Sequence, residues 1–364
     1  MPNPSLTRAD FGALPDGRPV ERWTLDSGGG VRADVLTYGG VLHALWVPDT
    51  TGRSASVVLG QDSVADYARS PYFGSLVGRY ANRIAHGRFT LDGQDYQVPV
   101  NDRGHALHGG PDGFHHRLWE AGPADVPDGV GLALTLHSPH GDMGFPGALD
   151  VTVTYALDRA GTLRIDYTAT TDRPTVVNLT NHAYFNLAGE GSGDVLGHTL
   201  ALDADRYLPV SAEAIPLGDP VGVADTAFDF SVPRAIGERI GRDDPQVRAA
   251  GGYDHCWVLS PRPAHFGPAR AARLEDPLSG RRLEVWTTEP GIQVYTGNTL
   301  DGSFTGRDAK PYERHGAVCL ETQHLPDSPN RPGYPSTVLR PGAAYRSTTE
   351  LRFPHLPQAA TPRV

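Results

Sequence analysis

The stretch L-D-V-T-V-T-Y-A-L-D-R-A-G-T-L-R-I-D-Y-T-A-T, from Leu149 to Thr170, indicates the fold class of this chain. Apolar and polar residues alternate on both sides of Arg159-Ala160-Gly161, and a period of two is typical of a strand with one buried face. A short turn that contains glycine commonly joins two such strands in a β-hairpin. The stretch therefore predicts a pair of antiparallel strands.

Alternating runs of this kind recur between turn signals along the chain, whereas helical periodicity is scarce. Asp92-Gly93 lies between two of them and predicts a second, tight hairpin. Short helical turns are expected near Ser63–Ser70 and Val232–Ile240. No repeat of fixed period and no linker divides the sequence. We predict an all-β protein, a large antiparallel β-sandwich with few short helices, in which residues 1–364 form a single domain.

The bulk properties of the 364 residues argue against several classes of partner. The formal net charge is −10, and a nucleic-acid-binding surface needs a basic face instead. No stretch approaches the ~20 apolar residues of a membrane helix. The N-terminal M-P-N-P-S-L-T-R-A-D lacks the apolar segment of a secretory signal. We expect a soluble, cytoplasmic protein that binds neither nucleic acid nor membranes.

The two cysteines, Cys256 and Cys319, lie in apolar stretches. The main interpretation is a pair of buried, reduced thiols in a cytoplasmic protein. A single disulfide is the alternative, and the sequence leaves it open.

Several common catalytic motifs are missing from the sequence. There is no P-loop, no G-x-G-x-x-G between a strand and a helix, no G-x-S-x-G and no C-x-x-C. These absences argue against nucleotide binding, dinucleotide binding and serine-hydrolase chemistry.

His182 lies in T-V-V-N-L-T-N-H-A-Y-F-N-L, Thr175 to Leu187, which we interpret as one strand. One face would be almost entirely apolar, and the other would carry uncharged polar and aromatic side chains, among them His182 and Tyr184. That face suits a neutral, hydroxyl-rich ligand; a solvated outer face is the alternative, although Lys and Glu usually cover exposed strands. Because imidazole transfers protons near neutral pH, His182 is either an acid–base group or a structural strand histidine.

Glu321 and His324 form an E-x-x-H sequence in C-L-E-T-Q-H-L-P-D-S-P-N, Cys319 to Asn330. Such a pair binds metal on a helix, where residues i and i+3 share a face. Two prolines follow at once and would break a helix. A strand is the better interpretation, with Glu321 and Gln323 on one face and His324 on the other. We therefore expect no metal site here.

On that face Glu321 would have small or apolar neighbours and the amide of Gln323 beside it. Desolvation disfavours the charged form of a carboxyl group and raises its basicity, which suits a general base. The alternative is a structural glutamate that accepts hydrogen bonds from the turn P-D-S-P-N. The segment alone leaves both interpretations open.

Other groups that could bind a hydroxyl-rich ligand lie mostly at predicted strand ends. They comprise two amides, one arginine, one aspartate and a histidine before two glycines: Asn82, Gln293, Arg83, Asp254 and His108. Each is a weak signal alone, since an arginine in a β-protein is most often a surface cation and L-H-G-G is also compatible with an ordinary turn.

Together these segments resemble the aldose 1-epimerase, or galactose mutarotase, family. The resemblance covers Tyr38 to Phe353 and rests on motifs in family order: G-R-Y-A-N-R-I, A-L-H-G-G-P-D-G-F, G-D-M-G-F-P-G, N-L-T-N-H-A-Y-F-N-L, Y-D-H-C-W-V-L, Q-V-Y-T-G-N and C-L-E-T-Q-H-L-P-D-S-P-N. It implies a large antiparallel β-sandwich with an open sugar-binding cleft. It also implies an isomerase that interconverts the anomers of free aldoses such as galactose and glucose.

The resemblance assigns roles to the candidate residues. It makes Glu321 the catalytic base, His182 the catalytic acid and His108 an assisting group at the ring oxygen. The implied sugar-binding residues are Asn82, Arg83, Asp254, Gln293 and Tyr184. Only protons move in the implied reaction, so no metal and no organic cofactor is expected. A small-molecule aldose is the expected partner, and the family contains both monomers and homodimers.

The implied mechanism needs Glu321 ionised and His182 protonated at the start, and Asp254 could help to hold the histidine protonated. The chain departs from the family pattern after L-H-G-G. It has Phe114-His115-His116 where an acidic or amide residue and then a base usually follow the phenylalanine. That departure leaves the local loop contacts open.

Two rival functions are compatible with the same fold. A hexose-6-phosphate epimerase would need clustered basic residues for the phosphate, and Arg83 is the one basic residue among the candidates. A non-catalytic sugar-binding protein would have lost Glu321 or His182, and both are present.

Overall fold

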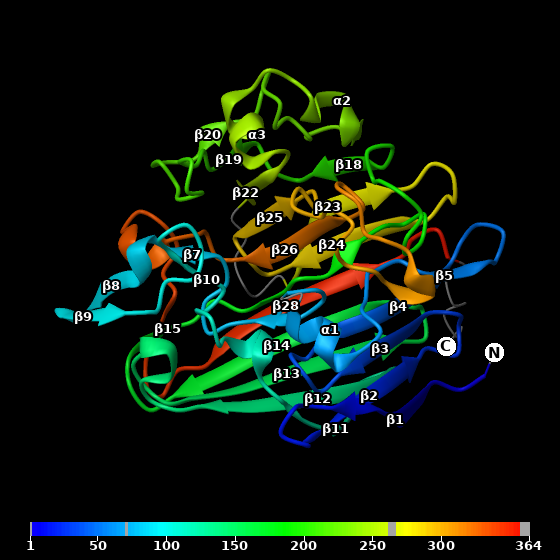
Figure 1. Ribbon diagram of the computed structural model, residues 1–364, viewed down its shortest axis with the longest axis horizontal. Coiled ribbons are helices and arrows are strands. Elements are labelled where there is room, and N and C mark those ends of the chain that lie inside the picture. Colours follow the sequence, from blue (N-terminus) through cyan, green and yellow to red (C-terminus); the bar gives the residue numbers. More distant parts are fainter. Residues whose placement is uncertain (1, 70–71, 261–266, 357–364) are drawn as a thin grey trace.

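The structure is a computed structural model that describes residues 2–69, 72–260 and 267–356. It confirms the all-β prediction: every pairing between its named strands is antiparallel. Three large sheets contain most of the strand residues, and Figure 1 shows the long strands of the largest one running across the molecule. Whether residues 1–364 act as one domain stays a prediction.

The largest sheet has nine strands and contains the hairpin predicted from Leu149 to Thr170. Leu157 pairs with Leu163 across that hairpin. In spatial order its strands are β11 (Glu120–Ala124), β12 (Gly129–Ser138), β13 (Leu149–Asp158), β14 (Leu163–Thr171), β28 (Tyr345–Arg352), β24 (Arg282–Thr287), β23 (Ala269–Glu275), β18 (Thr199–Leu202) and β21 (Arg234–Ala235).

A five-stranded sheet and a six-stranded sheet accompany it. The five-stranded sheet is an N-terminal meander of β1 (Ser5–Ala13), β2 (Pro19–Asp26), β3 (Arg32–Leu36), β4 (Leu42–Pro48) and β5 (Ser54–Ser56). The six-stranded sheet has the order β17 (Tyr184–Phe185), β26 (Val318–Gln323), β25 (Gly291–Tyr295), β22 (Asp254–Val258), β19 (Arg206–Tyr207) and β20 (Val221–Gly222).

Four short ribbons and a few helical turns complete the described chain. The ribbons pair β10 (Ala106–Leu107) with β7 (Arg83–Ile84), β15 (Thr175–Val176) with β27 (Val338–Leu339), β16 (Thr180–Asn181) with β6 (Leu76–Val77), and β8 (Arg88–Leu91) with β9 (Gln94–Gln97). The helical turns are α1 (Val64–Arg69), α2 (Gly237–Ile240), α3 (Pro245–Ala250), η1 (Ala85–Gly87), η2 (Phe114–His116), η3 (Asp142–Gly144), η5 (Arg307–Ala309) and η6 (Ser328–Asn330).

The local predictions have mixed outcomes. The tight hairpin at Asp92-Gly93 is confirmed, since Leu91 pairs with Gln94. The turn expected near Ser63–Ser70 is α1, with Ser70 outside the described residues. The turn expected at Val232–Ile240 is helical only from Gly237, because Arg234–Ala235 is the edge strand β21.

Helix α3 was not predicted, although its sequence carries a start signal. The Asp244 side chain accepts hydrogen bonds from the backbone N–H groups of Gln246 and Val247, and Pro245 occupies the first helical position. An aspartate cap followed by proline is a known beginning of a short helix.

The prediction of one strand from Thr175 to Leu187 is wrong, because the segment forms three two-residue strands with different partners. The side chains of two buried asparagines bond to backbone groups of distant segments. Asn178 exchanges hydrogen bonds with the backbone of His324 and donates to the Ala81 carbonyl. Asn186 donates to the Gly316 carbonyl. Side-chain bonds of this kind compete with a regular ladder.

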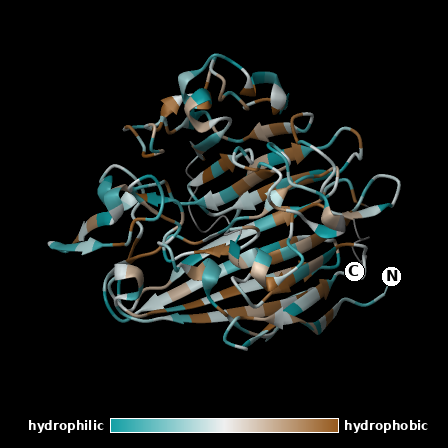
Figure 2. Cartoon of the chain, in the orientation of Figure 1, coloured by the Kyte–Doolittle hydropathy of each residue, from teal (hydrophilic) through white to brown (hydrophobic). Residues whose placement is uncertain are grey.

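One large cluster of buried apolar side chains joins the three sheets. It includes Leu25 and Val35 from the five-stranded sheet, Leu132 and Val153 from the nine-stranded sheet, and Leu320 from the six-stranded sheet. Hydrophobic and hydrophilic residues alternate along these strands (Figure 2). The alternation that predicted strands therefore also brings the sheets together around a common core.

The six-stranded sheet uses its two faces differently, and this positions the site. On β26, Val318 and Leu320 pack into the common core, and the Thr322 hydroxyl lies 2.6 Å from that of Thr349 on β28. Successive residues of a strand point to opposite sides. The intervening Cys319, Glu321 and Gln323 therefore face away from the nine-stranded sheet.

Both cysteines, Cys256 and Cys319, are buried free thiols, which confirms the main interpretation and excludes a disulfide between them. Within the described ranges, no helix has the length and apolar character needed to cross a bilayer.

Arg79 is a buried anchor between two parts of the chain, and its replacement should be strongly destabilising. Its guanidinium donates to the carbonyls of Ser138, Pro146 and Gly147 and to the Ser138 hydroxyl. Each buried carbonyl left without a donor costs about 1–3 kcal/mol. We predict that Arg79→Met lowers the free energy of unfolding by about 3–5 kcal/mol, measured by urea denaturation. Arg164→Met, at a half-exposed ion pair with Asp166, is the control and should change it by less than about 1 kcal/mol; equal effects would refute the anchoring role.

Candidate active site

Polar side chains line up on the outward face of the six-stranded sheet. Across β22, β25 and β26 the register aligns Asp254 with Tyr295 and Cys319, and Cys256 with Gln293 and Glu321. Aligned residues on neighbouring strands share a face, so this register brings together three candidates from distant parts of the chain.

His182 reaches the same place from the connection between β16 and β17. Its backbone N–H donates to the Ser75 carbonyl at 2.9 Å, and its carbonyl accepts from the Gly74 N–H at 2.9 Å. Tyr184, the first residue of β17, pairs with Cys319 on β26. The β17–β26 pairing thus holds the His182 segment beside the strand of Glu321.

Asn82 and His108 face each other from a second wall. Both residues have a positive φ, 62° for Asn82 and 52° for His108. This backbone conformation is uncommon for residues other than glycine and is often found at functional sites. The Asn82 N–H donates to Nδ1 of His108 at 3.1 Å, and the Asn82 side-chain oxygen accepts from the Arg83 N–H at 2.8 Å. Arg83 Nε donates to Asp102 at 2.9 Å.

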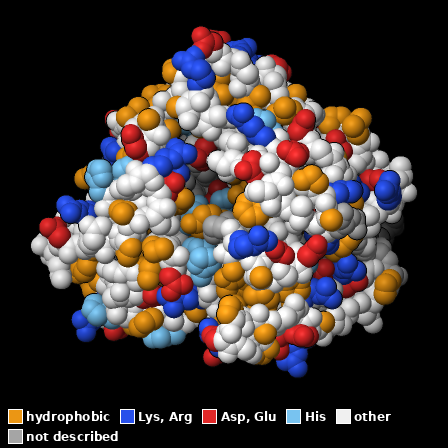
Figure 3. All heavy atoms as spheres, in the orientation of Figure 1, with side chains coloured by type: hydrophobic (Ala, Val, Ile, Leu, Met, Phe, Trp, Pro, Cys, Tyr) orange, Lys and Arg blue, Asp and Glu red, His pale blue; other side chains and the backbone are white. Residues whose placement is uncertain are grey.

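All eight residues predicted from the sequence line one cleft of about 180 Å³, with six further residues: Tyr72, Asp102, Arg103, Leu107, Tyr295 and Thr299. Drug-sized ligands occupy cavities of about 300–1,000 Å³, so the cleft admits only a small molecule or part of a larger one. Figure 3 shows a hollow near the middle of this face of the molecule, with histidine and hydrophobic side chains in its wall. The lining is rich in hydrogen-bonding groups.

A larger groove of about 870 Å³ lies over β13, β14 and β28, yet it is a weaker candidate for an active site. Its charged side chains already pair with one another, as in Arg164 with Asp166 and Arg352 with Glu350. The small cleft, by contrast, contains buried polar atoms that have no partner in the described structure, among them Oε2 of Glu321 and Oε1 of Gln293. Such atoms mark a place where a ligand or water binds.

His182 and Glu321 form a histidine–carboxylate pair in the cleft, with Nε2 and Oε1 3.6 Å apart. Both side chains are almost completely buried. Burial lowers the pKa of His182 to about 4, and the charge of Asp254 opposes this only in part. Burial, reinforced by the charge of Asp254, raises the pKa of Glu321 well above 4.5, although Arg83 opposes the rise. Each group is therefore driven towards its neutral form.

This outcome differs from the expectation that Asp254 keeps His182 protonated in the resting site. Asp254 does raise the pKa of His182, but desolvation is the larger effect. A neutral imidazole with a carboxylic acid and an imidazolium with a carboxylate contain the same total number of protons, and they differ only in which group holds the shared one. Burial favours the first arrangement, and one proton transfer from Glu321 to His182 produces the second.

His108, His182 and Glu321 place one potential ligand atom each within 4.8 Å of one another, so the cluster needs a test as a metal centre. Metal-binding imidazoles use one nitrogen for the metal and donate the N–H of the other. In His108, Nδ1 accepts a hydrogen bond from Asn82. The remaining Nε2 of the neutral ring then carries the proton and presents a donor to the cleft. His108 therefore suits a ligand oxygen better than a metal ion.

His324 has a different partner from the one its sequence position suggests. Its Nδ1 lies 2.6 Å from Oε2 of the buried Glu289, and the Tyr345 hydroxyl donates to Oε1 of the same carboxylate at 3.1 Å. Burial opposes charge on both groups, but their mutual attraction outweighs it, raising the pKa of His324 and lowering that of Glu289. The E-x-x-H sequence thus contains members of two separate pairs, which agrees with the prediction that Glu321 and His324 point to opposite sides.

His182 belongs to a column of aromatic rings. Its ring stacks on Tyr184 with centroids 5.1 Å apart, Tyr184 stacks on Phe73 at 4.5 Å, and Phe73 stacks on Tyr312 at 5.7 Å. The planes of successive rings differ by 23°, 12° and 20°. This column connects the cleft to the interior.

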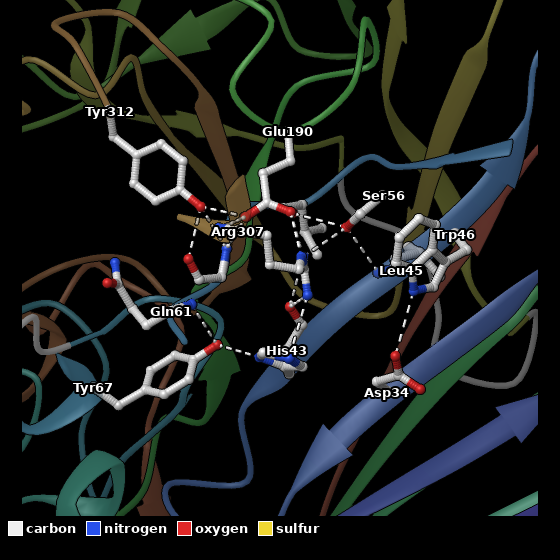
Figure 4. Close-up of polar contacts among 12 residues, drawn as sticks. Asp34, His43, Leu45, Trp46, Ser56, Gln61, Tyr67, Glu190, Arg307 and Tyr312 are labelled. Atoms are coloured by element: carbon white, nitrogen blue, oxygen red, sulfur yellow. Dashed lines mark hydrogen bonds and ion pairs between the residues drawn. The ribbon is translucent and has the colours of Figure 1, made fainter. Parts of the chain in front are cut away.

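A buried polar network holds the inner end of the column. The Tyr312 hydroxyl contacts the Glu190 carboxylate, which also accepts from Nε of Arg307 at 2.5 Å. Figure 4 shows Glu190 between Tyr312 and Arg307, with His43 and Tyr67 at the other end of the network. The Arg307 guanidinium donates to the His43 carbonyl, and His43 lies 2.8 Å from the Tyr67 hydroxyl. These bonds hold Tyr312 in place at the inner end of the ring column, whose outer end is Tyr184 and His182 beside the cleft.

Sequence reasoning missed several lining residues. Tyr72, Asp102 and Arg103 lie in loops where no periodic pattern indicates which way a side chain points. Tyr295, two residues after Gln293 on β25, also lines the cleft. The one available signal for Tyr72 is its place in P-Y-F-G, just before the G-R-Y-A-N-R-I motif.

A buried histidine–carboxylate pair in a small polar cleft is suited to proton transfer on a small polar molecule. The aldose 1-epimerase family profile matches residues 21–352. Galactose mutarotase from Rattus norvegicus is 44% identical over 352 residues, covering 96% of this chain and 98% of that protein. Aldose 1-epimerase from Escherichia coli (strain K12) is 39% identical over 342 residues, covering 93% and 96%.

A solved structure shows the same architecture. The crystal structure of galactose 1-epimerase from Lactobacillus acidophilus NCFM superimposes with a TM-score of 0.84 at 28% identity, covering 96% of this chain and 99% of that one. The chain belongs to the aldose 1-epimerase family and is an isomerase.

The pKa values of His182 and His324, each of which has a glutamate partner, should be shifted in opposite directions. We predict that the pKa of His182 lies near 4, because desolvation dominates, and that the pKa of His324 lies above 6.5, because Glu289 dominates. Histidine ring-proton NMR over a pH series measures both, with His182→Asn and His324→Asn used to assign the signals. A His182 signal that titrates at or above that of His324 would contradict the balance of effects described here.

Proposed function

We propose that the protein is an aldose 1-epimerase that interconverts the α and β anomers of free aldohexoses such as galactose and glucose. The observation that carries the proposal is the buried His182–Glu321 contact at 3.6 Å, inside a small cleft lined by hydrogen-bonding side chains. The names of the relatives support the same activity.

The two groups divide the proton transfers between them. In the reactive arrangement Glu321 is a carboxylate and His182 an imidazolium. Glu321 removes the proton of the anomeric hydroxyl while His182 donates a proton to the ring oxygen, and the bond between C1 and the ring oxygen breaks. Rotation about C1–C2 of the open-chain aldehyde presents the other carbonyl face. Reclosure reverses both transfers, gives the other anomer and restores the starting protonation state.

The remaining residues recognise and orient the sugar. The Nε2–H of His108 can donate to the ring oxygen side, since its Nδ1 is occupied by Asn82. Asp254 accepts a hydrogen bond from Gln293 at 2.7 Å, so the two present a joined carboxylate–amide edge to sugar hydroxyls. Asn82, Arg83 and Tyr184 complete the proposed contacts. Holding the sugar in one orientation contributes to catalysis by itself.

The proposal includes the setting of the enzyme. Its partner is a small-molecule aldose, its location is the cytoplasm, and it acts as a monomer or a homodimer. Because each turnover moves protons alone, the chemistry calls for neither a metal ion nor an organic cofactor.

The phosphate-sugar alternative finds no support in the cleft. Two arginines line it, Arg83 and Arg103, so Arg103 adds a basic group that the sequence had not indicated. Both lie against the same carboxylate: Arg83 is 2.9 Å and Arg103 4.0 Å from an oxygen of Asp102. Charges that are already paired attract a phosphate less strongly than a free cluster.

Removing the base should abolish most turnover. We predict that Glu321→Gln lowers kcat by about 10²–10⁴-fold and leaves KM largely unchanged, because glutamine keeps the shape and the hydrogen-bonding ends. The assay is polarimetry on freshly dissolved α-D-galactose and α-D-glucose, with the uncatalysed rate subtracted. Glu289→Gln is the matched control, since it alters a buried glutamate paired with a histidine outside the cleft, and its kcat should stay close to wild type. Near-wild-type turnover in Glu321→Gln would reject Glu321 as the base.

The dependence of kcat/KM on pH should be bell-shaped. Below about pH 4, the pKa of His182, the pair holds two protons and no base remains. As pH rises through the raised pKa of Glu321, the pair loses its last proton and no acid remains. We predict an acidic limb near pH 4, and its loss together with a lower rate in His182→Asn. An identical profile in this variant would rule out His182 as the acid.

A further inference from the structure

Tyr72 packs against the His182 ring in addition to Tyr184. Its ring lies with its centroid 5.8 Å from that of His182 and with the planes 20° apart, and Tyr184 stacks on His182 at 5.1 Å and 23°. The plane of each phenol ring is therefore close to that of the imidazole, and both tyrosines contact the ring.

His182 lacks the polar support that usually orients a catalytic histidine. Such a ring normally donates the N–H of its second nitrogen to a carboxylate or carbonyl. In the described structure no acceptor meets hydrogen-bond geometry at Nδ1 of His182, although the backbone carbonyl of His182 itself interacts with the ring and raises its pKa. The ring contacts with Tyr72 and Tyr184 therefore contribute to holding this imidazole in place.

The backbone of Tyr72 indicates that this placement is enforced. Its φ is 84°, in a region that a bulky side chain rarely adopts and that persists where the surroundings compel it, commonly at active sites. The Ser75 N–H donates to the Tyr72 carbonyl at 3.1 Å and closes the turn. Gly74 and Ser75 of this turn exchange two hydrogen bonds with the backbone of His182. The turn and the histidine are therefore fixed to each other.

We propose that Tyr72 is a positioning residue for the proton transfer: together with Tyr184 it clamps the His182 imidazole so that Nε2 faces Glu321, and it keeps water from the ring. The inference rests on the proposed function and deepens it.

The residues at which the chain departs from the family pattern, His115 and His116, belong to the same ring cluster as Tyr72. The ring of His115 packs on Tyr72 with centroids 4.6 Å apart, and His108 meets it edge-on at 4.6 Å. His116 in turn packs on His115 at 4.1 Å. His115 and His116 thus support the Tyr72 ring, which is the local contact that this departure from the family pattern makes.

The groups that surround His182 determine what loss of the clamp does to its titration. The charged and titratable ones are Glu321, Asp254, Arg83, His108, His115, Tyr72, Tyr184 and Tyr295. Burial is the largest effect on the pKa of His182. Removing the Tyr72 ring admits water to one face of the imidazole, and the pKa should rise from about 4 towards the ordinary 6.5.

Three substitutions separate positioning from other roles. Tyr72→Phe keeps the ring and removes the hydroxyl. Tyr72→Leu keeps bulk without a planar face. Tyr72→Gly removes the ring but suits a positive φ, so loss of packing is offset by relief of the backbone. We expect Tyr72→Phe to stay within about threefold of wild-type kcat. Tyr72→Leu and Tyr72→Gly should lose about tenfold to a hundredfold in kcat, with smaller changes in KM.

Two readouts distinguish this proposal from simple destabilisation and from failure of the proposed function. The acidic limb of kcat/KM should move to higher pH in Tyr72→Leu and Tyr72→Gly but not in Tyr72→Phe. NMR titration of His182 requires no substrate, and it should show the same rise even if wild type proves inactive on aldoses. An unchanged His182 pKa in Tyr72→Leu would overturn the proposal, as would a Tyr72→Phe variant as impaired as Tyr72→Leu, because the hydroxyl would then be the active group.

Discussion

Burial of the pair formed by His182 and Glu321 is the constraint on which the rest of the site depends. At 3.6 Å and almost completely buried, the two groups are driven towards a state with one proton between them. Glu289 and His324 show the contrast: at 2.6 Å, with the Tyr345 hydroxyl as a further donor and with the His324 side chain partly exposed, a pair of the same composition is stabilised as ions. We propose that the longer contact leaves the proton of the His182–Glu321 pair free to move and leaves space for substrate oxygens.

The sandwich supplies this environment by using the two faces of one sheet for different purposes. One face of the six-stranded sheet completes the common core with Leu320 and its neighbours. The other face carries Glu321, Gln293 and Asp254 in register on three strands. Strands held by a large core place their side chains more reproducibly than loops do. Loops from the N-terminal half then add His108, Asn82 and the turn of Tyr72 around that rigid face.

Much of this arrangement was predictable from sequence because it follows strand alternation. The period of two predicted the sandwich, the hairpins and the orientation of Glu321 away from His324. What failed was the prediction for Thr175 to Leu187, where buried Asn178 and Asn186 interrupt the ladder by bonding to backbone groups from distant segments. Tyr72 escaped prediction for a related reason, since a turn with positive φ has no periodicity and its contacts are all tertiary. The protonation of the pair was also not predictable, because sequence does not reveal how completely water is excluded.

The central claim is that the pair moves protons on sugar oxygens and leaves the carbon-bound hydrogens in place. The most direct measurement is NMR of α-D-galactose with the protein in deuterium oxide, following the anomeric signals and the hydrogens on C1 and C2. We predict that the approach to the anomeric equilibrium is accelerated in proportion to protein concentration, with full retention of hydrogen at both carbons. Deuterium at C1 or C2, or an approach no faster than in buffer, would contradict the account.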